Sequence, residues 1–348
     1  MQLKDYLTFG RSGLVVSPLA LGTMTFGQND WGADEEVSRR VFDAYRGAGG
    51  SFIDTADIYS GGRAEEMVGK FVADTGARDD VVIATKFGFN RTDKPHHGGN
   101  GAKNIHRALE GSLKRLGTDY VDLYWMHVWD NVTPIEEVLQ TLGDIQRAGR
   151  IRYFGLADMP AWVALKAATI AAERGMPGPV GLQMEYSLVA RGIERTLVAG
   201  ALDTGMSIQP WSPLAGGLLA GKYERGDTGG KGRLSGDNPF GNSKFTERNF
   251  GIVDVLREVA DDAGCLPAQA AIAWVLAQRG IRAPVLGASN AEQIEATIAA
   301  ADIDLGEEAL GRLNEASALD LEFGDVPMMT GMNKIAFGGN AVRGWNEL

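Results

Sequence analysis

The 348-residue sequence has almost no cysteine and little histidine. Cys265 is its one thiol, so the chain cannot form an internal disulfide or a cluster of thiolate metal ligands. We expect this residue to be buried filler beside the start of a helix. Two of the four histidines, His96 and His97, are adjacent in a Gly-rich segment. Neighbouring side chains on an irregular loop chelate poorly, so we expect solvated histidines and no metal site.

Long apolar runs and positive charge are also scarce. No stretch approaches the ~20 consecutive apolar residues of a membrane span, and the start of the chain lacks the pattern of a signal peptide. We therefore expect a cytoplasmic protein without a membrane segment. The 34 basic residues are scattered among 45 acidic ones, and the net charge of −11 disfavours a nucleic-acid partner. Hydrophobic residues make up 44% of the chain, which predicts a folded globular protein.

Short apolar runs typical of buried strands alternate eight times with stretches of helical period. The expected strands are Leu19–Leu21, Phe52–Asp54, Val81–Ala84, Val121–Tyr124, Tyr153–Leu156, Gly181–Met184, Ser207–Gln209 and Pro284–Leu286. The first seven start roughly 30 residues apart, which is the length of one βαβ unit. Strands that alternate with helices predict a parallel sheet. Eight such units predict a (β/α)8 TIM barrel better than an open doubly wound sheet.

Several helices between these strands have readable ends. The segment Thr133-Pro134-Ile135-Glu136 has the pattern of a capping box with Thr133 as the N-cap. The segment from Ala102 to Leu116 is amphipathic, and Gly117 follows it as an expected C-terminal stop. Asn290 is the expected N-cap of the last barrel helix.

Three segments fall outside the repeat. Leu7 to Val16, with the turn Gly10-Arg11-Ser12-Gly13, predicts a hairpin that plugs the barrel floor. Gly221 to Phe250 is expected to be a long loop before the next helix, and Leu321 to Leu348 is a tail without a clear period. No linker or composition shift separates a second domain, so residues 1–348 are expected to form a single barrel domain.

Polar residues at successive strand ends point to chemistry, because the loops after the strands build the active site of such a barrel. Asp54 ends the second strand and Tyr59 follows it, while Lys86 and His127 end the third and fourth. A free tyrosine has a pKa near ~10, and a neighbouring ammonium stabilises the phenolate. Lys86 can supply that charge, Asp54 can keep it charged, and His127 can orient a substrate oxygen. Each residue alone has an ordinary structural explanation, but their joint appearance favours a proton-transfer site.

Longer segments carry a family resemblance. They are Gly22-Thr23-Met24, Phe52 to Tyr59, Ala84-Thr85-Lys86, Leu116 to Leu123, Gln183-Met184-Glu185-Tyr186 and Trp211-Ser212-Pro213-Leu214. In this order they resemble the aldo-keto reductase family, from about Leu7 to Leu313. The resemblance implies a nicotinamide cofactor, hydride transfer to a substrate carbonyl and Tyr59 as the proton donor. No Gly-x-Gly-x-x-Gly segment follows a strand, so the doubly wound dinucleotide fold receives no support.

The resemblance also implies a cofactor site. It places Gly22, Thr23, Met24 and Asp54 in that site, Asp158 and Gln183 at the carboxamide, Trp211 against the nicotinamide ring, and Ser212, Pro213, Leu214, Gly216, Gly217 and Leu218 along the pyrophosphate. Glycines there let backbone N–H groups approach an anion. Asp158 stands where asparagine is usual, and an ionised acid cannot donate a hydrogen bond. Trp211 replaces the usual tyrosine.

The phosphate end of the cofactor site departs further from the family. Gly287, Ser289, Asn290 and Gln293 open the last barrel helix, and the segment Gly287 to Gln293 contains no Lys or Arg. Its helix N-terminus can still bind a phosphate through hydrogen bonds. Ala296-Thr297 replaces the usual adenine-binding Glu-Asn pair. NADP(H) is expected, with NAD(H) as the alternative.

The expected substrate is a small carbonyl or alcohol of sugar-like, cyclic or aromatic type. Trp31, Phe89 and Trp129, from loops after three strands, are expected to line its pocket with Tyr59 and His127. Two other functions stay open. One is a regulatory module resembling the potassium-channel β-subunits of this family, which the lack of a long N-terminal extension disfavours. The other is a cofactor-binding protein without turnover. An oligomer is compatible with either.

Overall fold

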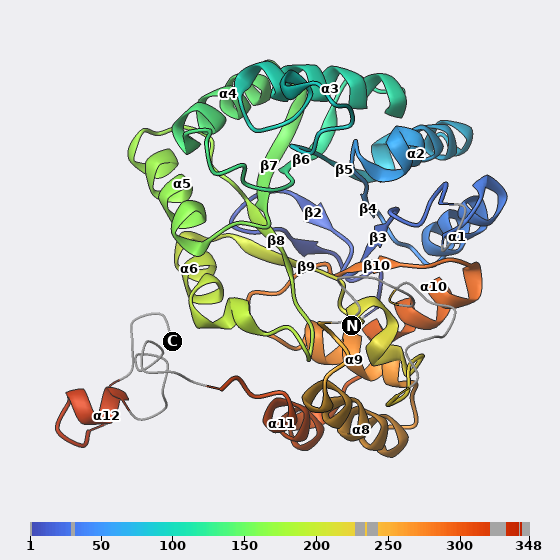
Figure 1. Cartoon of the computed structure of the whole chain (residues 1–348), viewed down its shortest axis with the longest axis vertical. Helices are drawn as coiled ribbons and strands as arrows, with labels where there is room; N and C mark the ends of the chain where they lie inside the picture. Colours follow the sequence, from blue (N-terminus) through green and yellow to red (C-terminus); the bar gives the residue numbers. More distant parts are fainter. Residues whose placement is uncertain are drawn as a thin grey trace.

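The barrel predicted from the alternation is present. The computed structural model describes residues 2–28, 32–226, 234, 243–320, 332–340 and 342. Its parallel strands are β3 Ala20–Gly22, β4 Phe52–Asp54, β5 Val82–Phe87, β6 Val121–Met126, β7 Ile151–Ala157, β8 Gly181–Glu185, β9 Ser207–Trp211 and β10 Val285–Gly287. They pair in the order β10-β3-β4-β5-β6-β7-β8-β9 (Figure 1). An isolated parallel bridge between Ile208 and Ile281 joins the two edges, so the (β/α)8 prediction is confirmed.

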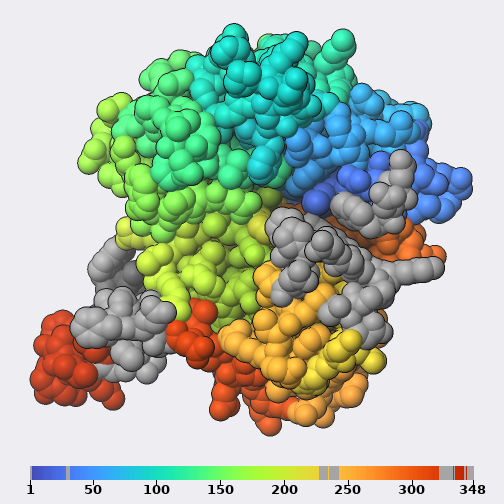
Figure 2. All heavy atoms as spheres, viewed as in Figure 1, coloured from blue at the N-terminus to red at the C-terminus, as the bar shows by residue number. Residues whose placement is uncertain are grey.

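Helices form a ring outside the strands (Figure 1). They are α1 Glu35–Gly47, α2 Arg63–Thr75, α3 Ala102–Leu116, α4 Ile135–Arg147, α5 Ala161–Glu173, α6 Leu197–Thr204, α8 Glu247–Asp262, α9 Pro267–Leu276, α10 Ala291–Ile298 and α11 Gly306–Ala316. Figure 2 shows the colours running from blue through green to yellow around the molecule, with orange atoms beside the blue ones. Among the described residues, no helix is long and apolar enough to cross a membrane.

Helix boundaries follow the sequence signals with one exception. Gly117 ends α3 in the left-handed conformation (φ 64°), and the Asn290 side chain accepts from the N–H of Gln293 at 2.8 Å, both as predicted. The prediction that Thr133 is an N-cap is wrong. Its hydroxyl donates to Asp130 at 2.7 Å, and α4 begins at Ile135 without a side-chain cap. Asp130 also accepts from the backbone N–H groups of Val132 and Thr133. The Thr133 hydroxyl therefore bonds to this nearby carboxylate and does not cap the helix.

The predicted hairpin closes the N-terminal end of the barrel. Strands β1 Leu7–Thr8 and β2 Val15–Val16 pair antiparallel. Phe9 between them is fully buried and meets Phe52 and Trp125 edge-on, with ring centroids 5.9 and 6.1 Å apart. The N–H of Gly10 donates to the Ser207 hydroxyl at 2.7 Å. Since Phe52 and Ser207 begin their strands, the plug lies at the end opposite the strand carboxyl ends.

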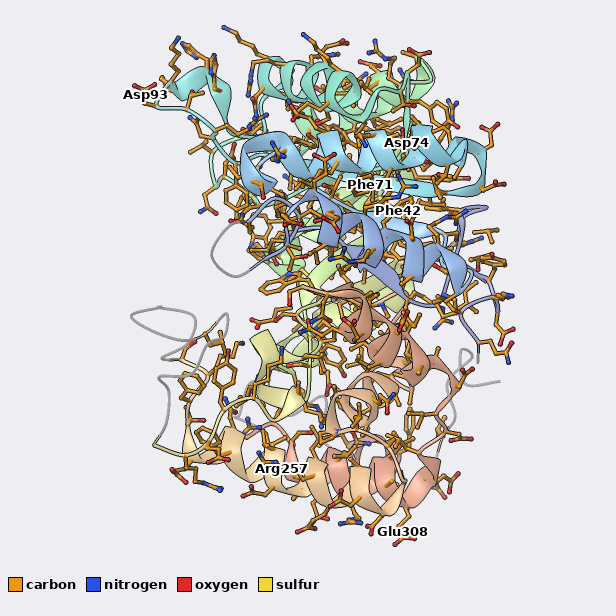
Figure 3. The ribbon with its side chains drawn as sticks, turned by 90° about the vertical axis from the view of Figure 1, so that its right-hand side faces the viewer. Phe42, Phe71, Asp74, Asp93, Arg257 and Glu308 are labelled. Atoms are coloured by element: carbon orange, nitrogen blue, oxygen red, sulfur yellow. The ribbon has the colours of Figure 1, made fainter. Side chains whose placement is uncertain are left out.

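Packing between helices and strands supplies the outer core. Phe42 of α1 and Phe71 of α2 lie with ring centroids 5.6 Å apart (Figure 3).

Two predictions from the sequence need correction. The loop Gly221 to Phe250 ends earlier, since α8 begins at Glu247 with the Thr246 side chain as its cap. Cys265 is only half-buried, although it packs against the core.

The tail expected to lack a period contains one short helix. Met332–Ala336 forms α12, which lies away from the barrel (Figure 1). Most other residues of the segment Leu321 to Leu348 lie outside the described residues.

Candidate active site

The barrel brings the ends of β4, β5 and β6 together at one mouth. Asp54 is the last residue of β4, Lys86 lies near the end of β5, and His127 directly follows β6. Parallel register places Asp54 beside Ala84 and Lys86 beside Trp125, so the polar side chains occupy neighbouring strands at similar height. Lys86 is fully buried and Asp54 is 2% exposed. Two opposite charges therefore meet in a nearly dry site, where each needs the other.

Lys86 lies between a carboxylate and a phenol. Its ammonium forms an ion pair with Asp54, donates to the carbonyl oxygen of Thr55 at 2.8 Å and donates to the Tyr59 hydroxyl at 3.4 Å. The ammonium is also 5.0 Å from the centroid of the Tyr59 ring. The ion pair and the two hydrogen bonds stabilise the positive charge, and the bond to the Tyr59 hydroxyl brings that charge to the phenol oxygen.

The surroundings shift the pKa of both charged groups. Burial lowers the pKa of Lys86, but the charge of Asp54 and then the contact with Tyr59 outweigh it, so the net shift is upward. Burial also raises the pKa of Asp54, against the opposing charge and hydrogen bond of Lys86. An ammonium with a raised pKa stays protonated across the neutral range.

His127 faces the same phenol as a neutral ring. Its centroid lies 5.9 Å from that of Tyr59 and 4.7 Å from that of Phe89, both edge-on. Burial, followed by the charge of Lys86, holds the pKa of His127 well below its usual range. Its buried Nδ1 has no hydrogen-bond partner among the described residues. A buried ring nitrogen without a partner is the kind of group that a substrate oxygen or water completes.

Tyr59 is held by an unusual turn between β4 and α2. Ser60, Gly61 and Gly62 all have positive φ values, of 48°, 65° and 100°. The Ser60 hydroxyl donates to the carbonyl oxygen of Phe26 at 2.5 Å. A left-handed serine is strained, so this bond helps to fix the turn that carries the phenol.

A chain of amides supports Asp54 from the far side of the mouth. The Gln183 side-chain nitrogen on β8 donates to Asp54 and to Gln209, both at 2.8 Å, and Gln209 donates to the carbonyl oxygen of Ala283 at 3.0 Å. Gln183 was predicted as a cofactor residue, and it lies beside Asp54 and the catalytic candidates. Gln209 was missed. The signal available was a polar residue inside the buried run Ser207 to Trp211.

Asp158 and Trp211 contact each other across β8. The indole N–H of Trp211 donates to the Asp158 carboxylate at 2.9 Å. Burial raises the pKa of Asp158 to about 6, with the Trp211 hydrogen bond acting in the opposite direction. The carboxylate thus has a partner within the protein, which the sequence did not indicate.

The glycine-containing loop after β9 is already hydrogen-bonded within itself. Gly216 donates its N–H to the Ser212 hydroxyl at 3.2 Å, and Gly217 donates to the Leu214 carbonyl oxygen at 2.9 Å. Both N–H groups therefore have partners within the loop, and their approach to a pyrophosphate stays a prediction. Pro213 lies in the same loop, and Leu218 is buried within the following 3-10 helix η5 Ala215–Ala220. Ser212 and Ala215 have positive φ values of 55° and 49°, so the backbone is strained.

The start of α10 keeps fewer free donors than expected. The backbone N–H and hydroxyl of Ser289 both donate to the Gln293 side chain at 3.1 Å, and Asn290 caps the Gln293 N–H. The N–H groups of Ala291 and Glu292 have no hydrogen-bond partner within the part of the chain that the structure describes. These two remain available to an anion.

The remaining predicted residues lie near these groups or outside the described part. Gly22 ends β3 and Gly287 ends β10, beside each other in register. Thr23 donates its N–H and hydroxyl to the Asp54 carbonyl oxygen, and Met24 follows it. Trp31 lies outside the described residues.

Phe89 and Trp129, both predicted to line the pocket, follow β5 and β6. Phe89 is 42% exposed, and Trp129 meets Trp162 of α5 edge-on with centroids 5.3 Å apart. The indole nitrogen of Trp129 is buried without a partner among the described residues. Trp162 was missed, because its exposed position at a helix start carries no signal of its own.

A second group of buried charges lies behind Tyr59 and was also missed. Glu65 of α2 is fully buried and accepts from Thr85 at 2.6 Å and from Arg115 of α3 at 2.6 Å. Asp57 is 2% exposed, and one of its oxygens has no partner among the described residues. Burial, with the charge of Glu65, raises the pKa of Asp57 to about 7.

Similarity to known proteins agrees with this site. The Aldo/keto reductase family model matches residues 18–318. The chain is 36% identical to the uncharacterized oxidoreductase YrpG of Bacillus subtilis (strain 168), over 89% of this chain and 95% of that protein. It is 32% identical to an NADP(+) aryl-alcohol dehydrogenase of Phanerodontia chrysosporium, over 94% and 86%. A probable voltage-gated potassium channel subunit beta of Oryza sativa subsp. japonica is 34% identical, over 86% and 92%. The chain therefore belongs to the aldo-keto reductase family and is an oxidoreductase acting on carbonyl and alcohol groups.

Proposed function

We propose that this protein interconverts a carbonyl compound and its alcohol with a nicotinamide cofactor, and that Tyr59 is the general acid and base. The observation that carries the proposal is the position of the Lys86 ammonium, which is paired with Asp54 and lies 3.4 Å from the Tyr59 hydroxyl. A phenol needs such a neighbour to exchange its proton near neutral pH.

The four residues have separate roles in this proposal. During reduction, the Tyr59 hydroxyl donates its proton to the substrate oxygen, and Lys86 stabilises the phenolate that remains. During oxidation, the phenolate takes the proton back from the alcohol. Asp54 keeps Lys86 charged, and the neutral His127 ring hydrogen-bonds the substrate oxygen and directs it toward Tyr59. When bound, the cofactor supplies the hydride in one direction and accepts it in the other.

The residues present fit such a cofactor at its nicotinamide end better than at its phosphate end. Gln183, Asp158 and Trp211 border the mouth beside the Asp54–Lys86 pair. The phosphates would be held by the free N–H groups at the start of α10 and by the Ser212 to Leu218 loop. The loop would first have to exchange its internal hydrogen bonds for bonds to the phosphate. We propose NADP(H) as the preferred cofactor, with NAD(H) as the alternative, because a relative is named for NADP(+).

Aromatic side chains after β5 and β6 support a flat or cyclic substrate. Phe89 contacts the His127 ring, Trp129 follows His127 by two residues, and aromatic rings favour stacked or edge-on partners. We therefore propose an aromatic aldehyde or its alcohol ahead of a sugar-like compound. The name of the aryl-alcohol dehydrogenase relative supports the same order.

One experiment tests this function. The purified protein is titrated with NADPH and NADH by fluorescence, and a panel of aromatic, cyclic and sugar aldehydes and alcohols is run in both directions. We expect tighter binding of NADPH and turnover of at least one aromatic pair. Tighter NADH binding would reverse the cofactor order, and no turnover with any pair despite cofactor binding would contradict the proposed enzyme.

A second candidate function rests on the relative named as a potassium channel subunit. A regulatory module of that kind should bind the cofactor but turn over slowly, and it should form a stable tetramer. Size measurement in solution together with the substrate panel separates the two functions. We also propose a cytoplasmic location. We propose no nucleic-acid partner, because the chain has 45 acidic and only 34 basic residues.

A further inference from the structure

The contact between Asp158 and Trp211 is the feature of the mouth that the proton-transfer chemistry does not use. Asp158 directly follows β7 and Trp211 ends β9, with β8 between them. Their hydrogen bond of 2.9 Å therefore spans an intervening strand at its carboxyl end. The N–H of Asp158 also donates to the carbonyl oxygen of Gln183 on that strand at 3.2 Å. The backbone of Asp158 is thus hydrogen-bonded to β8, and its carboxylate accepts the indole N–H from the strand beyond.

Backbone conformation limits what can stand at position 158. Asp158 has a φ of 44°, in the left-handed region that glycine, asparagine and aspartate tolerate best. Glycine has no side-chain acceptor, whereas asparagine and aspartate can both accept from an indole N–H. The turn and the hydrogen bond therefore favour the same two residues.

The charges around Asp158 are few. Lys86, paired with Asp54, lowers the pKa of Asp158, and Glu185 at the end of β8 raises it. Glu185 is itself paired with Lys244, which precedes α8. Gln183 beside it is uncharged. Burial is the largest influence, so the carboxylate is desolvated and its bond to the indole is strengthened by the charge.

We infer that Asp158 is a positioning residue, whose carboxylate fixes the plane of the Trp211 indole at the barrel mouth so that the indole presents a fixed face to the cofactor. This inference rests on the proposed function, because it needs a flat ring to bind beside Trp211. A ring held in one orientation before binding loses less conformational entropy when its partner arrives. Asp158 thus acts through Trp211 and need not donate a hydrogen bond itself, which accounts for an acid at this position.

The test uses the full-length protein and five variants. Asp158→Gly removes the acceptor without straining the turn, Asp158→Asn keeps an acceptor without the charge, and Trp211→Phe keeps a ring without the donor. The double variant combines Asp158→Gly with Trp211→Phe, and Trp274→Phe is the matched control at another indole, whose N–H donates to Asn314 at 3.0 Å. Tryptophan fluorescence is followed from pH 4.5 to 8 without cofactor, and the dissociation constants for NADPH and NADH are measured at pH 7.5.

If Asp158 fixes the Trp211 indole, the variants should differ in fluorescence and in cofactor binding. The wild type and Trp274→Phe should show a fluorescence transition near the protonation of Asp158, and the variants that lack the Asp158 carboxylate or the Trp211 indole should not. Asp158→Gly and Trp211→Phe should each weaken cofactor binding roughly five- to ten-fold, and the double variant should bind no worse than either alone. Asp158→Asn should bind within about two-fold of the wild type, because its amide oxygen rescues the hydrogen bond.

Three results would overturn the inference. They are additive losses in the double variant, binding by Asp158→Gly as tight as in the wild type, and binding by Asp158→Asn as weak as in Asp158→Gly. The last would mean that the charge acts on the ligand and not on the indole. Failure of the proposed function looks different, because the wild type would then bind neither cofactor or would turn over no pair of the substrate panel.

Discussion

Buried charges around the site are compensated, with one exception. Lys86 pairs with Asp54, and Glu65 pairs with Arg115. Asp57 has no such partner for one of its oxygens within the described residues, although it lies two residues before the proposed catalytic tyrosine. A buried carboxylate without a full set of hydrogen bonds favours its protonated form. Asp57 should therefore make stability depend on pH.

Asp57→Asn should stabilise the protein at alkaline pH. The pKa of Asp57 is raised to about 7 in the folded chain, whereas an unfolded aspartate titrates near ~4. The folded state thus binds the proton more tightly, and its stability falls as pH rises from ~4 through about 7. Removing the charge should raise the free energy of unfolding by up to about 4 kcal/mol at pH 8.5, and by far less at pH 5.

Urea denaturation at the two pH values measures this difference. The exposed Asp93 (Figure 3) provides the control, because Asp93→Asn should leave the pH dependence unchanged. A pH dependence of Asp57→Asn equal to that of the wild type would mean that Asp57 stays ionised without penalty.

Single residues were predictable where a motif carried them. Asp54, Lys86 and His127 each end an apolar run, so their convergence followed from the parallel sheet. The partner of Asp158 did not follow, since Trp211 is 53 residues further along the chain and the bond depends on how β7 and β9 lie across β8. The missed Asp57 carries no local pattern that separates it from a solvated loop residue.

At the level of elements, the N-terminal hairpin contributes more to stability than its length indicates. Phe9 is fully buried among barrel residues that include Phe52 and Trp125. Phe9→Ala should lower the free energy of unfolding by about 3–5 kcal/mol, because it removes a buried ring and leaves a cavity under the barrel. Val15→Ala, on the 52% exposed side of the same hairpin, should cost about 0.5 kcal/mol or less. Equal losses in chemical denaturation would contradict the plug.

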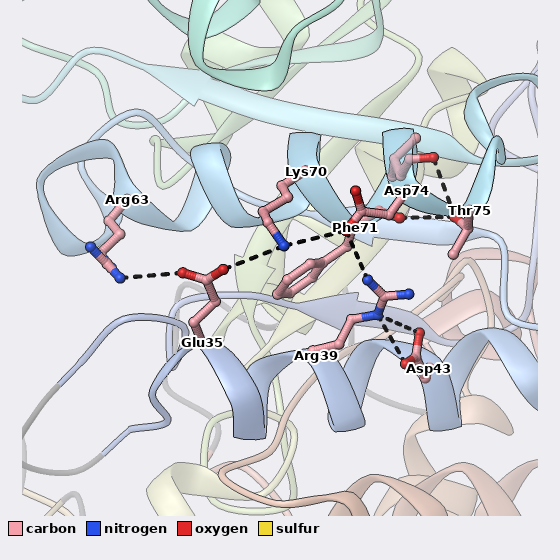
Figure 4. Close-up of polar contacts among 9 residues, drawn as sticks. Glu35, Arg39, Asp43, Arg63, Lys70, Phe71, Asp74 and Thr75 are labelled. Atoms are coloured by element: carbon pink, nitrogen blue, oxygen red, sulfur yellow. Dashed lines mark hydrogen bonds and ion pairs between the residues drawn. The ribbon is translucent and has the colours of Figure 1, made fainter.

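Helices α1 and α2 carry ion pairs of a different kind on the outside (Figure 4). Arg39 pairs with Asp43 at 2.9 Å and with Asp74 at 3.1 Å, and all three side chains are at least 32% exposed. Arg39→Ala should cost about 1 kcal/mol or less. Glu65→Gln should cost about 3–5 kcal/mol, because Glu65 is fully buried and the change leaves Arg115 without its counter-charge. Thermal denaturation of both variants would show the contrast, and similar melting temperatures would refute it.

Helix ends followed the sequence where a capping residue marked them and no side chain competed locally. Gly117 and Asn290 ended and began their helices as expected. The exception at Thr133 arose because Asp130 offered its hydroxyl a nearer acceptor. Such competition depends on the conformation of the loop, and the spacing of capping residues in the sequence does not predict that conformation.

For the whole molecule, the alternation of strands and helices was enough to predict the barrel. Closure through Ile208 and Ile281 could not be predicted, because it is a single bridge between β9 and a residue outside the strands. The proton-transfer half of the site could be predicted, since strand ends of a barrel share one mouth. At the cofactor half, Gly216, Gly217 and Ser289 already donate to other groups of the chain, and only tertiary structure decides such pairing.

The central claim is that Tyr59 exchanges the proton, supported by Lys86 at 3.4 Å. The most direct test is the steady-state rate of Tyr59→Phe, with cofactor binding measured in parallel, because phenylalanine keeps the ring and removes only the hydroxyl. The rate should fall at least about 100-fold while the dissociation constant of the cofactor changes by less than about two-fold. A variant that keeps the full rate would contradict the claim.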